Sequence, residues 1–161
     1  VGTPGDAFPM IRKFFDVNRA IIGLKCVGAA RQTLDEAIAH VQSRVQFGAP
    51  LASYQGVAFP IAEAATVLEL ARWQCYRVLW MRDRGMPCAV EGAMVKWWAT
   101  KVAAEVIHQC LLLHGHLAYT SRLPIEQRLR DLIGWQIGDG SPQIQKLIIA
   151  RSLFGKDVVP R

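Results

Sequence analysis

The sequence lacks a long apolar run and a cluster of basic residues. Charged side chains interrupt each apolar stretch before it reaches the roughly 18 residues that a membrane-spanning helix needs. Lys and Arg number 19 against 13 Asp and Glu, a net charge of +6, but no five basic residues stand together. A nucleic-acid-binding face is therefore not indicated. We expect a soluble, cytoplasmic protein with no membrane or nucleic-acid partner.

Closely spaced cysteine pairs are also missing. The absence of a CxxC motif disfavours a metal site or a disulfide, and buried free thiols in a reducing compartment are expected. His114 and His116 form an H-x-H pair, but no Cys or carboxylate stands beside them at ligand spacing. No metal is expected, and a zinc site at this pair stays an open alternative. The cysteines are Cys26, Cys75, Cys88 and Cys110.

Apolar residues recur near the 3.6-residue period along most of the chain, and no strand pattern competes with it. Three long amphipathic helices with short connections, plus shorter ones, predict an all-α fold: an up-down four-helix bundle with a short extra helix. The opening VGTPGDAF has no initiating Met, so we expect residues 1–7 to be a linker from a missing preceding domain and residues 8–161 to form the bundle domain. The helices are expected at residues 8–45, 53–84, 89–113, 125–136 and 142–154.

Several glycines and prolines mark special positions within this pattern. Gly23 and Gly28 lie inside the first expected helix, where each costs about 1 kcal/mol relative to Ala, so close helix packing is expected at both. Gly48, with Pro50 just beyond it, is expected to end that helix. Pro60 predicts a kink or a second start in the next helix.

A break between the last two expected helices carries a single carboxylate, Asp139, between Gly138 and Gly140. Ser141 is a plausible N-cap and Pro142 occupies the first helical position, where its missing N–H has no cost. The glycines permit unusual backbone conformations and close approach of a ligand. From spacing alone, an ordinary interhelical loop with a solvated Asp is the simpler interpretation.

Six motifs occur together along the chain. They are Arg44-x-x-Phe47-Gly48-x-x-Leu51 followed by Gln55, LELAR at 68–72, Lys96 in AMVKWWA, HGHLAYT at 114–120, Arg130-Asp131, and GDGSPQIQKLIIAR at 138–151. Their order and spacing resemble the C-terminal domain of the acyl-CoA dehydrogenase family. The resemblance implies a flavoenzyme, an oxidoreductase acting on CH–CH groups, whose helical and β domains precede this bundle. It also implies a homo-oligomer, a dimer or tetramer, with an isolated domain that is inactive.

The family reaction removes a proton from Cα of an acyl-CoA and passes the Cβ hydrogen to FAD. The resemblance implies that Asp139 is the catalytic base, a position usually held by Glu. Such a base must be a carboxylate held close to Cα in an apolar, water-poor environment. Some members carry the base on the first helix instead, but that position is Asn18, which cannot usefully accept a proton. The resemblance also implies acyl-CoA contacts for Asp16, Arg19 and Gly140, although a solvated helix face explains the first two equally well.

For the cofactor, FAD, the resemblance implies that Arg44 and Gln55 hold the pyrophosphate and adenine across a dimer interface, with Phe47 packed beside them. The guanidinium fork suits a phosphate, although a cation at a helix end is also favoured by the helix dipole. Ser141 and Gln143 are implied to contact FAD at a helix N-terminus, which suits anionic groups.

A glycine-rich loop of the family, Q-x-x-G-G-x-G-[FY], is altered here. Leu112 replaces the Gln, and His116 and Ala118 replace the second and third glycines. That stretch usually touches the FAD adenine of the neighbouring subunit. Either His116 stacks there instead, or FAD binds more weakly.

The catalytic position departs from the family because Asp is one methylene shorter than Glu. Either the base has retracted to fit a ring attached at Cα, or the chain is an impaired subunit. GWQIGDG, KWWA, IHQCLL-HGH and EQRLRD resemble the cyclohexanecarboxyl-CoA dehydrogenase branch, which favours an alicyclic acyl-CoA, with electron-transferring flavoprotein as acceptor. Two alternatives stay open: a non-catalytic assembly subunit, and a flavin oxidase-type relative.

Overall fold

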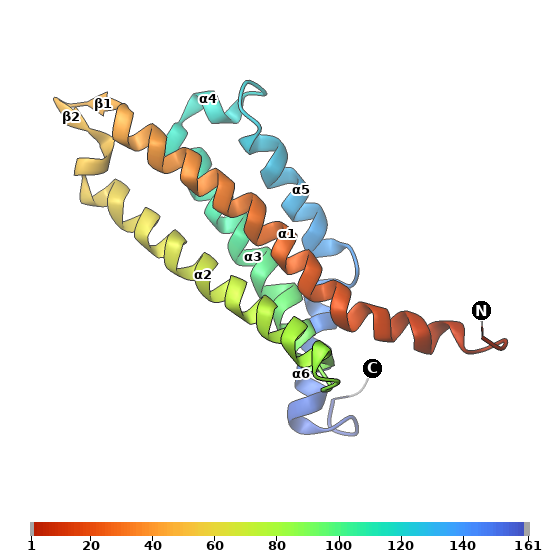
Figure 1. The fold of residues 1–161 in the computed structure, drawn as a ribbon. Coiled ribbons are helices and arrows are strands. Elements are labelled where there is room, and N and C mark those ends of the chain that lie inside the picture. The colour runs from red at the N-terminus through yellow and green to blue at the C-terminus, as the bar shows by residue number, and fades with distance from the viewer. Residues whose placement is uncertain (1, 160–161) are drawn as a thin grey trace.

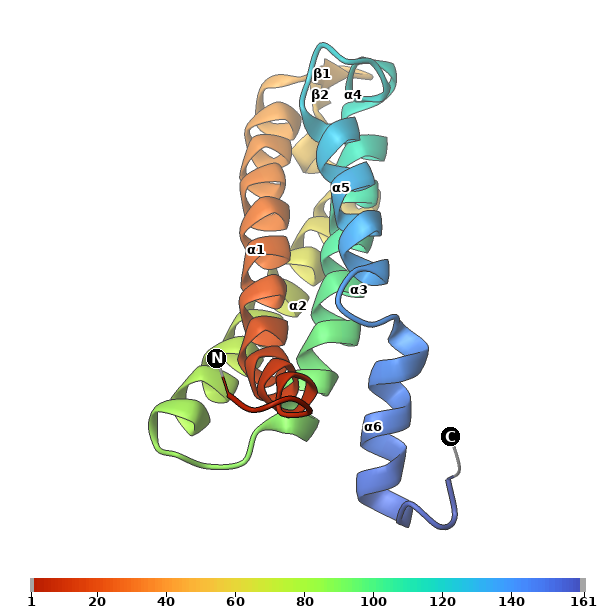
Figure 2. The same cartoon turned by 90° about the vertical axis from the view of Figure 1, so that its right-hand side faces the viewer.

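The computed structural model describes residues 2–159, and most of them belong to helices (Figure 1). Three long helices, α1 (Ala7–Ser43), α2 (Gln55–Asp83) and α3 (Ala89–His114), pack side by side. The shorter α5 (Ile125–Ile137) lies against α3 and α1 and completes a four-helix bundle, as the sequence predicts. The last helix, α6 (Pro142–Phe154), packs on α3 below α5 (Figure 2). Helix α3 therefore contacts every other long element.

A short hairpin joins α1 to α2, where no strand was expected. Strand β1 (Val45–Gln46) pairs antiparallel with β2 (Ala49–Pro50). The two residues between them, Phe47 and Gly48, have φ values of 52° and 85°. Positive φ at both central residues is the signature of a type I′ turn, which matches the twist of paired strands. Gly48 therefore serves the hairpin turn, and the expectation that it ends the helix is wrong.

Other boundaries differ from expectation by small amounts. Helix α1 ends at Ser43, two residues early, because the chain turns extended into the hairpin. A 3-10 turn, η1 (Leu51–Ser53), leads into α2, and the expected loop at 115–124 contains the short helix α4 (His116–Tyr119). Helix α2 continues through Pro60 without a second start, because Pro60 lies in its early turns, near the end where backbone N–H groups lack helical partners.

Close packing of the three long helices depends on Gly23. A Cβ atom at this position would lie 2.7 Å from Cγ1 of Val95 on α3 and 2.8 Å from Sγ of Cys75 on α2. The close contact expected at Gly23 is thus confirmed. The same expectation is wrong for Gly28, which is exposed and has no heavy atom within 4 Å of an added Cβ.

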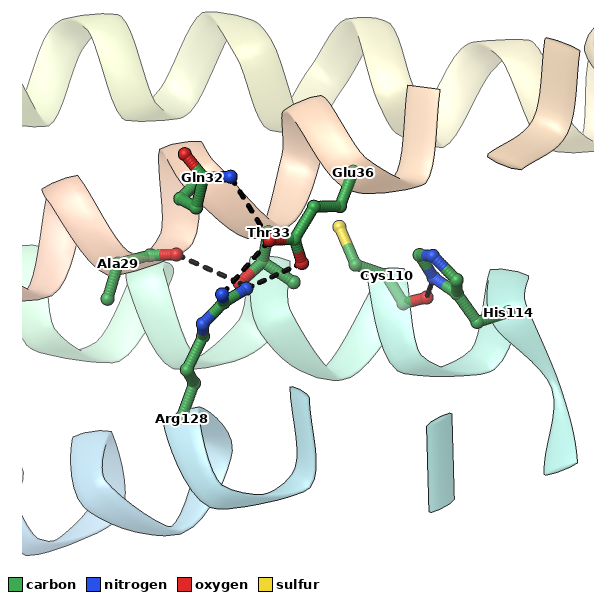
Figure 3. A network of polar contacts seen from close by, with 7 residues as sticks. All are labelled: Ala29, Gln32, Thr33, Glu36, Cys110, His114 and Arg128. Carbon is green, nitrogen blue, oxygen red and sulfur yellow. Dashed lines mark hydrogen bonds and ion pairs between the residues drawn. The ribbon is translucent and has the colours of Figure 1, made fainter. Parts of the chain in front are cut away.

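An ion pair attaches α5 to the last third of α1 (Figure 3). The guanidinium of Arg128 donates to both carboxylate oxygens of Glu36, at 2.6 and 3.0 Å, and to Oγ1 of Thr33 at 3.1 Å. Hydrogen bonds from Arg128 hold the pKa of Glu36 below its usual value. Two parallel bonds fix orientation as well as distance, so this contact sets how α5 lies on α1.

All four cysteines are free and buried, as expected. Burial raises the pKa of the Cys26 and Cys110 thiols to about 11 and that of Cys75 to about 12. Within residues 2–159, no three His, Cys, Asp or Glu side chains come together as a metal site, and no helix has the length and apolarity to cross a membrane.

The two glycines of α1 give a matched stability test. Gly23→Ala should lower the free energy of unfolding by about 1–3 kcal/mol, because its methyl group overlaps Val95 and Cys75. Gly28→Ala should raise it by about 0.5–1 kcal/mol, because Ala restricts the unfolded chain and meets open space. Urea unfolding followed by circular dichroism measures both, and equal effects of the two substitutions would contradict the packing described.

Candidate functional site

The expected carboxylate Asp139 lies in the loop between α5 and α6 in an unusual backbone conformation. Its φ of 56° is left-handed, and apart from Phe47 it is the only residue other than glycine in the described chain with positive φ. Aspartate tolerates this conformation better than most residues, and Gly140 beside it has a φ of 98°. The loop thus projects a half-buried carboxylate from a tight chain reversal.

A buried lysine on α3, Lys96, binds the backbone of this loop. The Lys96 side chain is fully buried, and its Nζ donates to the carbonyl oxygens of Gln136 and Gly140, each at 2.9 Å. Burial lowers the pKa of Lys96, while the negative charge of Asp139 acts in the opposite direction. One ammonium therefore joins the last turn of α5 to the residue that follows Asp139.

Helix α6 supports the same loop through Gln145. Its buried Nε2 donates to the carbonyl oxygen of Gly140 at 3.0 Å and, at 3.4 Å, to that of Asp139. A Cβ atom at position 140 would lie 2.6 Å from this Nε2, so only glycine fits there without displacing the Gln145 amide.

The side chain of Asp139 contacts α1 through Asn18. Nδ2 of Asn18 donates to Oδ2 of Asp139 at 2.6 Å. The two residues are 121 positions apart in the sequence. The sequence indicates only that Asn18 itself cannot serve as a base, whereas the fold makes it a hydrogen-bond donor to Asp139.

Asp16 lies two residues before Asn18 and Arg19 directly follows it, near the loop. Arg19 is buried, with Nη1 3.4 Å from Oδ1 of Asp16 and with no hydrogen-bond partner for Nε among the described residues. Burial lowers the pKa of Arg19, and the charges of Asp16 and Asp139 oppose that shift. Burial raises the pKa of Asp16, and Arg19 opposes it. A Cβ at Gly92 would lie 2.7 Å from the Asp16 carbonyl oxygen, so α1 and α3 approach closely here.

A cavity of about 740 Å³ lies between α1 and the connection from α2 to α3. Its wall includes the apolar side chains of Phe14, Ile21 and Met86 and the polar side chains of Asp16 and Asn18. This volume is typical of small-molecule sites, which combine apolar walls with a few polar groups. Asn18 is the residue that both lines this cavity and contacts Asp139.

The expected FAD residues at the start of α6 are close to Asp139 in the chain. Ser141 occupies the N-cap position and Pro142 the first turn, as predicted, but the Ser141 side chain makes no capping hydrogen bond. Ser141 is half-buried and Gln143 is exposed. The hydroxyl and the N-terminal amides of α6 are thus available to a polar or anionic group.

The remaining expected cofactor residues lie at the far end of the bundle (Figure 1). Arg44, Gln55 and His116 are exposed, on or beside the hairpin and α4. Phe47, at the tip of the hairpin, is 93% exposed. The His116 ring lies 6.2 Å from that of Tyr119, in a tilted arrangement. One chain thus carries its predicted cofactor residues in two separate groups, one beside Asp139 and one at the hairpin.

Sequence reasoning assigned no role to two residues that hold the loop. Lys96 was noted only as part of a motif, although a single lysine in the apolar stretch AMVKWWA is itself a signal for a buried, paired cation. Gln145 gave no such signal, because a glutamine near a helix start is ordinary on a solvated face. Their partners are backbone carbonyls of a loop, which a sequence pattern does not reveal.

Comparison with known proteins gives extensive matches. The family model described as "Acyl-CoA dehydrogenase, C-terminal domain" matches residues 5–154. A probable acyl-CoA dehydrogenase of Bacillus subtilis (strain 168), YngJ, is 33% identical over 154 residues, which are 96% of this chain and 40% of that protein.

Solved structures agree with this match. Butyryl-CoA dehydrogenase from Megasphaera elsdenii superposes with a TM-score of 0.91 at 28% identity, over 94% of this chain and 40% of that one. The structure of PigA with FAD and proline superposes with a TM-score of 0.92 at 25% identity, over 97% of this chain and 41% of that one.

The chain spans about 40% of the length of these relatives. The matched region includes all the long helices and the loop that carries Asp139. By the match to the family model and by its fold, the chain belongs to the acyl-CoA dehydrogenase C-terminal domain family.

Proposed function

We propose that this chain is the C-terminal part of an FAD-dependent acyl-CoA dehydrogenase and that Asp139 is the base that removes the Cα proton. Residues 1–7 then lead in from a preceding domain, and residues 8–161 form the bundle domain. The observation that carries the proposal is the construction of the Asp139 loop. Lys96 and Gln145 hold its backbone, and Asn18 holds its carboxylate, beside a cavity of ligand size.

The proton transfer places specific demands on this loop. A proton alpha to a thioester is weakly acidic, so the base must sit within hydrogen-bond reach of Cα. Asp139 has one oxygen bound to the Asn18 amide, which leaves the other to accept the proton. Backbone anchoring by Lys96 keeps the Cα of Asp139 in one place during the transfer, which matters because a misplacement of about 1 Å can cost about 100-fold in rate.

FAD fits the exposed groups that the chain presents. When bound, FAD accepts the hydrogen from Cβ of the substrate. Arg44 offers a bidentate donor for a phosphate, and Phe47, almost fully exposed, offers an aromatic face to a ring. Gln55 at the start of α2 and His116 on α4 lie at the same end of the bundle. Because this end is remote from Asp139, we propose that it serves the FAD of a second subunit in a homodimer or tetramer.

For the substrate, we propose an alicyclic acyl-CoA such as cyclohexanecarboxyl-CoA, with Asp16, Arg19 and Gly140 contacting it. A shorter base leaves more room at Cα, which suits a ring at that atom. The wall of the cavity is largely apolar, and Arg19 and Lys13 lie on the same helix as positive groups for an anionic substrate. The electron acceptor in this proposal is electron-transferring flavoprotein.

The first test is an anaerobic titration of the full-length flavoprotein with cyclohexanecarboxyl-CoA. Loss of the flavin absorbance band, with the unsaturated ring thioester as product, is the expected outcome. A yellow protein that other acyl-CoAs bleach but this one does not would reject the ring substrate alone. Peroxide formation in air in place of electron transfer to the flavoprotein acceptor would indicate an oxidase-type relative, and a colourless protein would indicate a non-catalytic subunit.

Asp139→Asn tests the base directly. The substitution keeps the size of the side chain but removes its ability to take a proton, so flavin reduction by substrate should fall by at least about 100-fold, as for loss of a general base. FAD content should stay as in the wild type. Stopped-flow absorbance measures the reduction rate, and an undiminished rate would reject Asp139 as the base.

Arg44→Ala tests the proposed phosphate contact. We expect largely colourless protein, because the substitution removes two charge-assisted hydrogen bonds to the FAD phosphate. The helical content should be unchanged, because an exposed guanidinium contributes little to folding. Arg31→Ala removes an exposed arginine of α1 that pairs with Asp35, and this matched control should keep full FAD occupancy. Full occupancy in both variants would assign Arg44 a structural role only.

A further inference from the structure

We propose that Asn18 is the positioning residue for the base: its side-chain amide holds one carboxylate oxygen of Asp139 and directs the other toward the substrate. This inference rests on the proposed function and deepens it, since the base alone does not specify what orients it. Asn18 is the single asparagine of the chain, and its Nδ2 lies 2.6 Å from Oδ2 of Asp139.

The backbone and the side chain of Asp139 are held by different partners. Lys96 and Gln145 bind carbonyl oxygens of residues 136, 139 and 140, so they fix where the Cα of Asp139 lies. None of these hydrogen bonds restricts rotation of the carboxylate about the side-chain torsions of Asp139. Within residues 2–159, Asn18 is the side chain that donates a hydrogen bond to that carboxylate, and it comes from a different helix.

The chemistry of an amide suits this task. A primary amide has no titratable proton in the working range, so Asn18 donates to the carboxylate without competing for the substrate proton. Donation to the ionised form favours that form, which keeps the base ready to accept a proton. The aspartate side chain is short and has few torsions with which to correct a poor orientation of its carboxylate. A hydrogen bond that fixes this orientation therefore matters more for Asp than for a longer side chain.

Charged neighbours do not substitute for Asn18. Arg19 on α1 and Lys96 on α3 interact electrostatically with Asp139, and Asp16 on α1 pairs with Arg19. Lys96 directs its ammonium to backbone carbonyls, and Arg19 donates to Asp16. These charges act at a distance and set no direction for the carboxylate. Replacing Asn18 leaves all of these charges in place, so its variants test the amide hydrogen bond separately from the surrounding charges.

Asn18 also lines the 740 Å³ cavity, so the test must separate a positioning role from loss of substrate contact. Loss of contact weakens thioester binding, whereas loss of positioning lowers the rate of flavin reduction at saturating thioester. If the role of Asn18 were purely structural, a variant that retains an amide on a longer stem would not recover that rate.

The experiment compares Asn18→Leu, Asn18→Gln and Asp139→Asn in the full-length flavoprotein. Leu keeps nearly the same volume without a donor, and Gln keeps the amide on a longer stem. Asn18→Ala makes the same deletion with less bulk and replaces the Leu variant if that one does not retain FAD. Gln32→Leu is the matched control, because Gln32 lies on the same helix and its amide donates to Glu36 at 3.1 Å, away from the site.

The saturating rate of flavin reduction should fall roughly 10- to 100-fold in Asn18→Leu, with a smaller change in thioester affinity. Asn18→Gln should recover part of the rate, and Gln32→Leu should match the wild type.

A wild-type saturating rate in Asn18→Leu, or in Asn18→Ala where that variant replaces it, with Asp139→Asn inactive, would overturn the positioning role and leave the proposed function standing. Failure of any acyl-CoA to reduce the wild-type flavin would reject the proposed function, and the positioning role with it. The rates of flavin reduction in the wild type and in Asp139→Asn thus distinguish the two failures.

Discussion

The buried ammonium of Lys96 constrains the part of the structure that carries the candidate base. An unpaired charge in the interior costs several kcal/mol, so this cation must find partners among the groups around it. It takes the carbonyl oxygens of Gln136 and Gly140, at the end of α5 and in the loop that follows. The glycines of the loop permit the tight chain reversal that these two hydrogen bonds require. The left-handed backbone of Asp139 is part of the same reversal.

Helix α1 connects this loop to the rest of the domain. Its 37 residues span about 55 Å at about 1.5 Å per residue, which exceeds the reach of any single site. Asn18 and Arg19 lie beside Asp139, Glu36 binds Arg128 of α5 in the last third of the helix, and Arg44 and the hairpin follow its far end. Helix α1 therefore contacts the proposed base and leads into the proposed cofactor group, at positions too far apart to serve one bound molecule.

Much of the fold could be predicted from local pattern. The 3.6-residue period located the five principal helices within a few residues, because each must bury one face against the others. The hairpin was missed because two-residue strands have no period to detect. Gly23 and Gly28 were indistinguishable in the sequence. Only the approach of α2 and α3 makes one of them a contact and leaves the other exposed.

The sequence by itself determined the all-α class, the Gly-Asp-Gly break and the family to which the chain belongs, because these are properties of neighbouring residues and of motif order. The tertiary structure alone decided what holds Asp139. Asn18 lies 121 residues away and Lys96 lies 44 residues from Gly140, and their meeting depends on how three helices pack. Asn18, which the sequence excludes as a base, thereby becomes the hydrogen-bond donor to the proposed base.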